Sequence, residues 1–347
     1  MRGSHTLGSG PATTLSHLSP SLWGLGGNAS FGVSRPTGSS GLTLRQSRAR
    51  VLVVAPLAIY LIESLPPGDQ RTGKHLLEDA LSPLCEQYDG NASYAYPQTR
   101  VHFFDLLRQI ATESSEGQLA PIIQIEAHGH LSPNGGTDGL LLASGAVVSW
   151  ADLGRALRAV NVASHNNVLL MLMACTSKDV IRMVDFADRA PFRGLVAALR
   201  DVTPDEVLGG MTIFYRTFLE TQSHVLAAER MNEAGRPDGS PPFGYVSAEA
   251  LFHTFVEKNY HRHMTARGRQ NMAERLVAMR RERPAEYLRD IVGLRRDIKG
   301  FLKTATKPIV KRKFDTFLMR DLYPGDQEWF EEIWEGCWPG EDKSGDG

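Results

Sequence analysis

His128 and Cys175 are the residues whose types and positions most directly suggest chemistry, and they lie 47 positions apart. His128 directly follows the apolar run 122–127, and Cys175 directly follows the apolar run 168–174. A cysteine thiolate is a nucleophile, and a neighbouring imidazole both favours the thiolate and later protonates a leaving amine. The pair therefore predicts cleavage of an amide bond, with Cys175 as nucleophile and His128 as acid and base.

Backbone N–H groups would complete this chemistry, because the tetrahedral intermediate of acyl transfer carries an oxyanion that needs fixed donors. Gly129 directly follows His128 and offers its N–H with no side chain in the way. The N–H of Cys175 itself is the second expected donor. Gly129 and Cys175 are therefore the predicted oxyanion hole.

Each of these residues also has a plainer interpretation. A single cysteine at the end of a strand is usually an inert core residue, and a single histidine there is usually structural. His130 is an alternative base, because side-chain alternation places it on the same side as His128. Glu126 and Asp138 are candidates to orient His128, but exposed carboxylates are the simpler interpretation. The sequence therefore assigns no third catalytic residue.

The elements that must position this pair follow an alternating pattern of strands and helices. The apolar and helical periodicities predict strands at 51–55, 101–104, 122–127, 168–174 and 194–199, and helices at 76–88, 150–160 and 204–218. Such alternation is typical of a mainly parallel sheet covered on both faces. Ligands bind beyond the carboxyl ends of these strands, where both His128 and Cys175 are expected.

The rest of the chain divides into segments of different composition. Residues 1–47 are a Gly- and Ser-rich flexible tail whose first five residues resemble an expression-vector leader, so its native extent is open. Residues 48–246 form the predicted core, which includes a linker or surface loop at 235–242. Residues 247–347 are the predicted helical extension, basic and then acidic and aromatic at the end, where Phe330, Trp334 and Trp338 lie on one helical face.

The basic part of this extension holds sixteen Lys and Arg against five Asp and Glu between Arg262 and Lys313. One interpretation is a solvated helix face, whose charge is partly balanced by the acidic end folding back on it. Docking on an acidic protein is a second, and binding of nucleic-acid phosphates is a third and less favoured one. Few aromatic residues interleave with the basic ones, so base stacking is not expected.

Composition narrows the partners, the disulfide or metal sites and the cellular location that we expect. The chain of 347 residues has a net charge of −1, so overall charge points to no partner. Cys85, Cys175 and Cys337 are too few and too scattered for a disulfide framework or a zinc site, and Cys85 and Cys337 lack a comparable histidine. We therefore expect no metal and no cofactor, a reducing cytoplasm as location, and no membrane association.

The His128-Gly129 and Ala174-Cys175 motifs together resemble the caspase-like cysteine proteases, which include caspases, metacaspases, separase and the CHAT family. In this fold the histidine lies roughly 50 residues before the nucleophile. The likeness is closest to CHAT and extends over about 48–232, with further similar segments at 193–202, 214–219 and 227–230. The resemblance implies an α/β, caspase-like fold with a mainly parallel sheet flanked by helices, followed here by the helical extension.

The resemblance also implies a cysteine endopeptidase that cuts a specific protein partner. Relatives act in bacterial antiviral defence or regulated cell death, and some are activated by a signalling complex, including CRISPR-associated, RNA-guided ones. The chain shows no tetratricopeptide repeat, with which CHAT domains often occur. The alternative is a catalytically silent module that docks on an effector complex or nucleic acid through its basic helices.

The specificity pocket is the least defined part of this expectation. Metacaspase-like enzymes carry an Asp two residues before the cysteine, but Met173 stands there, so a basic P1 preference is not supported. Arg200, followed by Asp201, is a candidate pocket residue that would favour an acidic P1 side chain. A surface arginine is the plainer interpretation.

Overall fold

The computed structural model describes residues 56–88, 90–131, 137–174, 177–234, 241–258, 266–281, 291–325 and 327–337. All of them lie in one compact unit that spans 40–347. The tail 1–47 and the strand expected at 51–55 lie outside the described residues, and so does most of the 235–242 loop. The predicted domain boundaries therefore stay predictions.

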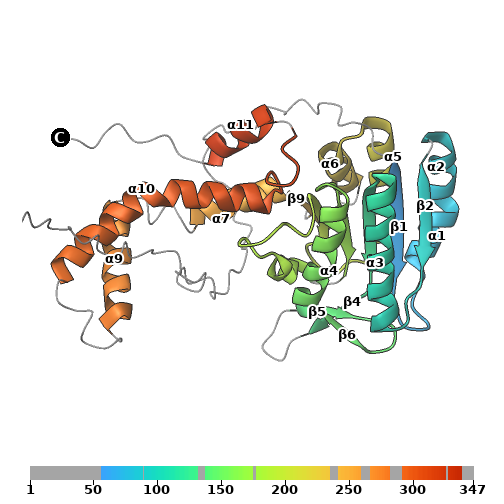
Figure 1. Cartoon of the computed structure of the whole chain (residues 1–347). Coiled ribbons are helices and arrows are strands. Elements are labelled where there is room, and N and C mark those ends of the chain that lie inside the picture. Colours follow the sequence, from blue (N-terminus) through green and yellow to red (C-terminus); the bar gives the residue numbers. More distant parts are fainter. Residues whose placement is uncertain are drawn as a thin grey trace, which may run out of the picture. The chain divides into compact units, whose positions relative to one another are not determined.

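A six-stranded sheet forms the centre of this unit, with the strand order β2-β1-β3-β7-β8-β9 (Figure 1). Its strands are β1 (Leu57–Glu63), β2 (Asn91–Ala95), β3 (Ala120–Glu126), β7 (Leu169–Met173), β8 (Gly194–Ala198) and β9 (Phe243–Ser247). The first five run parallel, and β9 pairs with β8 in the antiparallel direction. The prediction of a mainly parallel α/β sheet is thus confirmed.

Helices cover both faces of the sheet, as the continuous apolar character of its inner strands requires. One face packs on α3 (Arg100–Gly117) and α4 (Trp150–Ala163) through Ile123 and Ile125 of β3 and Leu170 and Leu172 of β7. The other face packs on α1 (Thr72–Leu76), the π-helical turn η2 (Leu77–Leu81), α2 (Ser82–Tyr88), α5 (Pro204–Thr221) and α6 (His224–Ala234). The predicted helices at 76–88, 150–160 and 204–218 are confirmed within these elements.

The segment 101–104, predicted as a strand, is instead part of α3. The side chain of Thr99 caps this helix by accepting a hydrogen bond from the backbone N–H of His102. Phe103, Leu107 and Ile110 are buried at helical spacing and face the sheet. The four-residue apolar window was too short to distinguish a strand from the first turn of an amphipathic helix.

A small antiparallel sheet extends from the carboxyl end of β3. Its strands are β4 (His128–Leu131), β5 (Thr137–Leu141) and β6 (Val147–Ser149). Gly139 of β5 lies so close to β6 that a Cβ atom at this position would come within 2.2 Å of the Val148 carbonyl oxygen. The indole Nε1 of Trp150 donates to the carbonyl of Thr137, which ties the start of α4 to the same sheet. His128 is therefore carried by a tightly packed unit.

The chain beyond β9 is mostly helical over the described residues, as predicted for 248–322. It forms α7 (Ala248–Val256), α9 (Ala266–Arg281), α10 (Ile291–Phe317) and α11 (Gln327–Cys337). Phe252 packs against both Phe314 and Phe317. Phe330 and Trp334 of α11 are buried near Phe314, whereas Trp338 lies outside the described residues. The predicted apolar face of α11 is thus a packing face.

Part of the basic charge in the extension is balanced within the chain. Glu331 of α11 accepts hydrogen bonds from Lys311 and Arg320, at 3.0 and 2.9 Å. Arg295 of α10 forms an ion pair with Glu274 of α9 at 2.7 Å. Among the described residues, no helix is both long and apolar enough to cross a membrane.

Candidate active site

His128 lies just beyond the carboxyl end of β3, as the sequence predicted. The strand ends at Glu126, Ala127 is buried, and His128 begins β4 opposite Leu141. The imidazole is 46% exposed, so a substrate can reach it, while its backbone is fixed by β-sheet pairing. This is the position that a catalytic base at a strand end requires.

Asp69 is the partner of this imidazole, with its Oδ2 atom 2.7 Å from His128 Nε2. Asp69 lies in the segment that joins β1 to α1, so it also comes from the carboxyl end of a parallel strand. Its backbone N–H donates to the carbonyl of Pro66, and Gly68 before it adopts a φ of +104°, which favours glycine. Sequence reasoning missed Asp69, because it did not place the strand that precedes it.

His130 has a carboxylate of its own. Its Nδ1 lies 2.6 Å from Oδ1 of Asp138. Asp138 precedes Gly139, which pairs with His130 across β4 and β5. His128 and His130 alternate with Gly129 along β4, which places them on the same face, as expected. The suggestion that Asp138 orients His128 is therefore wrong, because Asp138 binds His130. An orienting carboxylate does not by itself distinguish the two histidines.

Glu126 neither orients His128 nor faces solvent, so both interpretations given to it were wrong. Its side chain is buried and receives hydrogen bonds from Thr72 and Gln124. Burial, reinforced by the nearby Glu63, raises the pKa of Glu126 to about 7. The reason is alternation: Glu126 shares its face of β3 with Ile122 and Gln124, and this face is covered by α5.

Cys175 and Thr176 lie outside the described residues, but the strand before them does not. β7 is the direct neighbour of β3, and Glu126 of β3 pairs with Met173 of β7. His128 and Cys175 each follow this pair by two positions. The two adjacent strands therefore end at the same level, immediately before the histidine and the cysteine. The role of Gly129 and of the Cys175 N–H as oxyanion donors stays a prediction.

The three residues proposed for a specificity pocket lie at or beyond the carboxyl ends of β7 and β8. Met173 is buried on the α5 face of the sheet. Arg200 donates to both carboxylate oxygens of Glu206, at 2.6 and 3.1 Å, and Asp201 is exposed. Arg200, with the backbone N–H of Thr203, lowers the pKa of Glu206 to about 2. The pocket stays a prediction, and Arg200 would have to leave Glu206 to contact a substrate.

Two further cysteines, Cys85 and Cys337, occur outside the candidate active site. Cys85 is buried, and burial raises the pKa of its thiol, which disfavours the reactive thiolate. Cys337 ends α11, and its side chain lies outside the described part of the chain. Within the described ranges, no group of three or more His, Cys, Asp or Glu side chains is arranged to hold a metal ion.

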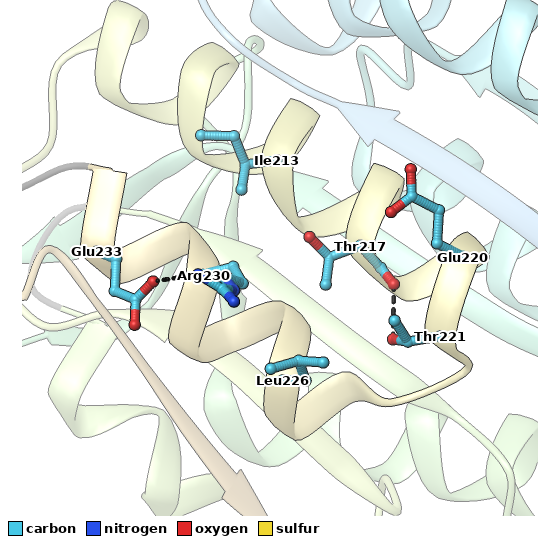
Figure 2. A pocket seen from close by; sticks show the side chains of 7 residues that line it. All are labelled: Ile213, Thr217, Glu220, Thr221, Leu226, Arg230 and Glu233. Atoms are coloured by element: carbon cyan, nitrogen blue, oxygen red, sulfur yellow. Dashed lines mark hydrogen bonds and ion pairs between the residues drawn. The ribbon is translucent and has the colours of Figure 1, made fainter.

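A separate hollow of about 540 Å³ lies between α5 and α6 (Figure 2). Its lining residues are Ile213, Thr217, Glu220, Thr221, Leu226, Arg230 and Glu233. Arg230 is paired with Glu233 at 3.0 Å, and Thr221 donates to the carbonyl of Thr217. The hollow contains neither histidine of β4, so it is not part of the candidate active site.

No protein-family model matches the sequence, and no curated protein matches it. Among solved structures, the chain is similar to the Drosophila initiator caspase Dronc, with 13% sequence identity and a TM-score of 0.38. The match covers 55% of this chain and 79% of that one.

Proposed function

We propose that the chain is a caspase-like cysteine endopeptidase with Cys175 as nucleophile and His128 as acid and base. The observation that carries the proposal is the Asp69–His128 pair at 2.7 Å, fixed at the carboxyl end of β3. The strand that leads to Cys175 is hydrogen-bonded directly to β3. A carboxylate behind an imidazole, next to a strand-end cysteine, is the combination that activates a thiol.

In the proposed mechanism, His128 takes the thiol proton of Cys175 and becomes an imidazolium, which the carboxylate of Asp69 stabilises. Because Asp69 engages Nε2, the ring nitrogen left for the sulfur is Nδ1. The thiolate attacks the scissile carbonyl carbon, and the oxyanion receives the N–H groups of Gly129 and Cys175. The imidazolium then gives its proton to the leaving amine, which breaks the C–N bond and leaves an acyl-enzyme.

Water completes the cycle. His128 takes a proton from the attacking water, and the resulting hydroxide adds to the thioester carbonyl of the acyl-enzyme. Collapse of this second tetrahedral intermediate expels the Cys175 sulfur, which recovers a proton from the imidazolium. Each step uses Asp69 in the same way, since the positive charge on His128 appears and disappears twice per cycle.

The finer features of the proposal come from the resemblance to CHAT proteases. They are cleavage of a specific protein partner, a role in bacterial defence or regulated cell death, and activation by a signalling complex. For substrate choice, Met173 argues against a basic P1 residue, and Arg200 is the candidate for an acidic one.

Digestion of a proteome-derived peptide library by the full chain, with mass-spectrometric identification of new termini, tests the proposal. The wild-type chain should generate a recurrent cleavage site, and the Cys175→Ala variant should generate none. A Cys85→Ala variant is the matched control and should cleave like the wild type. Equal cleavage by the wild type and Cys175→Ala would contradict the proposal.

A catalytically silent docking module is the second candidate function. The observation that favours it is the exposure of basic side chains on α9 and α10, among them Arg267, Arg275, Lys299 and Lys303. This candidate predicts that Cys175→Ala retains the biological activity and that reversing the charge of Lys299 and Lys303 removes it. The peptidase proposal predicts the opposite result for Cys175→Ala.

A further inference from the structure

Two glutamates are buried side by side beneath the candidate active site. Glu63 is the last residue of β1 and Glu126 the last residue of β3, and the parallel register pairs them directly. Their exposed fractions are 0% and 3%. Buried carboxyl groups are costly unless they are hydrogen-bonded, so their partners show what the pair is used for.

Three consecutive residues supply most of these partners. Thr72 donates its hydroxyl to Oε2 of Glu126, and the Gly73 N–H donates to Oε1 of Glu63 at 3.1 Å. The Arg71 guanidinium lies 3.8 Å from Oε2 of Glu63. All three belong to the end of the β1–α1 segment and the first turn of α1. The carboxyl pair therefore holds the chain immediately after Asp69.

The start of the same segment is also anchored at Glu126. The backbone N–H of Ser64 donates to the carbonyl of Glu126 at 2.8 Å, and the Ser64 hydroxyl donates to the carbonyl of Pro97. The hydroxyl of Tyr96 donates to the carbonyl of Leu65 at 2.7 Å, and its ring lies under the Arg71 guanidinium. Both ends of the segment that presents Asp69 are thus fixed at the ends of β1 and β3.

We infer that Glu126, together with Glu63, is a positioning residue that holds the 64–72 segment so that Asp69 stays on His128. The inference rests on the proposed function only in giving the Asp69–His128 contact a catalytic purpose. Among the described residues, the side chain of Glu126 accepts hydrogen bonds from Thr72 and Gln124, and His128 is not one of its donors.

The charge state of Glu126 makes this positioning sensitive to pH. The donors to Glu126 are a hydroxyl and an amide, whereas Glu63 receives Tyr94, Gly73 and the cationic Arg71. Burial and the neighbouring Glu63 raise the pKa of Glu126 to about 7. Opening of the segment that covers Glu126 releases this carboxyl to water, where its pKa is lower, so the free energy of opening falls as pH rises towards 7.

Other ionisable groups around the pair do not offset this charge. Tyr215 of α5 donates a hydrogen bond to Gln124, which in turn donates to Glu126. Burial raises the pKa of Tyr215 well above its usual value, and the nearby Glu126 and Cys85 of α2 raise it further. From β2, burial and the hydrogen bond to Glu63 raise the pKa of Tyr94. Among the described residues around the pair, Arg71 is a cation, and it lies against Glu63.

Hydrogen exchange in the full chain tests the inference without relying on catalysis. Peptides covering 64–73 should lose protection about 10-fold between pH 6 and 8, after correction for the intrinsic exchange rate. In the Glu126→Gln variant, which imitates the neutral acid, the protection of these peptides should be the same at pH 8 as at pH 6. Protection that is independent of pH in the wild type, or equally pH-dependent in Glu126→Gln, would overturn the inference.

A matched pair at Thr72 tests the effect on His128 and guards against a variant that fails to fold. Thr72→Ser keeps the hydroxyl and should leave the His128 ring resonances of a histidine-labelled chain in place. Thr72→Val keeps the shape and loses the donor, so it should shift them in the direction seen in Asp69→Asn. Unchanged His128 resonances in Thr72→Val would refute the positioning role. An inert Cys175 in every variant would refute the peptidase proposal while leaving this result valid.

Discussion

Oδ2 of Asp69 and Nε2 of His128 lie 2.7 Å apart, although the two residues are separated by 59 positions in the chain. The contact joins the carboxyl ends of β1 and β3, which are neighbours in the sheet. In a peptidase, a carboxylate in this place stabilises the imidazolium that forms when the thiol loses its proton. Asp69 is therefore the third member of the proposed catalytic group.

Asp69→Asn should lower the rate of peptide cleavage by at least about 10-fold, because the amide no longer stabilises the imidazolium. Asp138→Asn is the matched control, since Asp138 binds His130 instead. It should leave the rate within about 2-fold of the wild type. The measurement is kcat/KM on a peptide cut by the wild-type chain. The reverse pattern would identify His130 as the base.

The strength of the apolar patterns explains how much of this site was predictable. β3, β7 and β8 are continuous apolar runs buried on both faces, so their ends, and with them His128, could be placed from the sequence. β2 and β4 are short and carry the polar sequences Asn-Ala-Ser-Tyr-Ala and His-Gly-His-Leu, which have no strand signature. Contacts within such elements depend on tertiary packing.

Glu126 and Asp69 show two different reasons for failure. Glu126 ends an otherwise apolar run and lies four positions after Ile122, so strand alternation places both side chains on the same face of β3. The burial of Glu126 could therefore have been predicted from the sequence. Asp69 lies in a Pro- and Gly-containing segment after β1, a strand that was not predicted at Leu57–Glu63. Its partner is 59 positions away, and no local pattern encodes a contact of this kind.

Glu126 should make the stability of the chain fall as pH rises. The pKa of an acid that is raised on folding, here from 4.5 to about 7, means that the folded state binds more protons in this window. The free energy of unfolding should therefore decrease between pH 4.5 and 7, by on the order of 2 to 3 kcal/mol. Urea denaturation at several pH values measures it. The same decrease in Glu126→Gln would show that another group is responsible.

The Arg200–Glu206 pair should contribute to stability in the opposite direction. The pKa of Glu206 is lowered to about 2, so its contribution is present above pH 4.5 and is lost as pH falls towards 2. Arg200→Met should cost about 1 kcal/mol at pH 7, because Glu206 also completes the N-terminal capping box of α5. An unchanged denaturation midpoint, together with an altered P1 preference, would instead place Arg200 in the specificity pocket.

Gly139→Ala should disrupt the small sheet that carries His128. The added Cβ would lie 2.2 Å from the carbonyl oxygen of Val148, and backbone must move to relieve the clash. We expect a loss of roughly 2 to 4 kcal/mol in the free energy of unfolding. Gly209→Ala is the control, since its Cβ meets nothing within 4 Å and lies in α5. Gly209→Ala should raise the free energy of unfolding by roughly 0.5 to 1 kcal/mol. Equal effects of the two substitutions would contradict the packing described for β5 and β6.

The rate of Cys175 alkylation by iodoacetamide at pH 7, followed by peptide mapping of the full chain, tests the central claim most directly. With His128 acting on its sulfur, Cys175 should react at least about 10-fold faster than the buried Cys85 and should lose this advantage in His128→Ala but not in His130→Ala. A Cys175 that reacts no faster in the wild type than in His128→Ala would contradict the account.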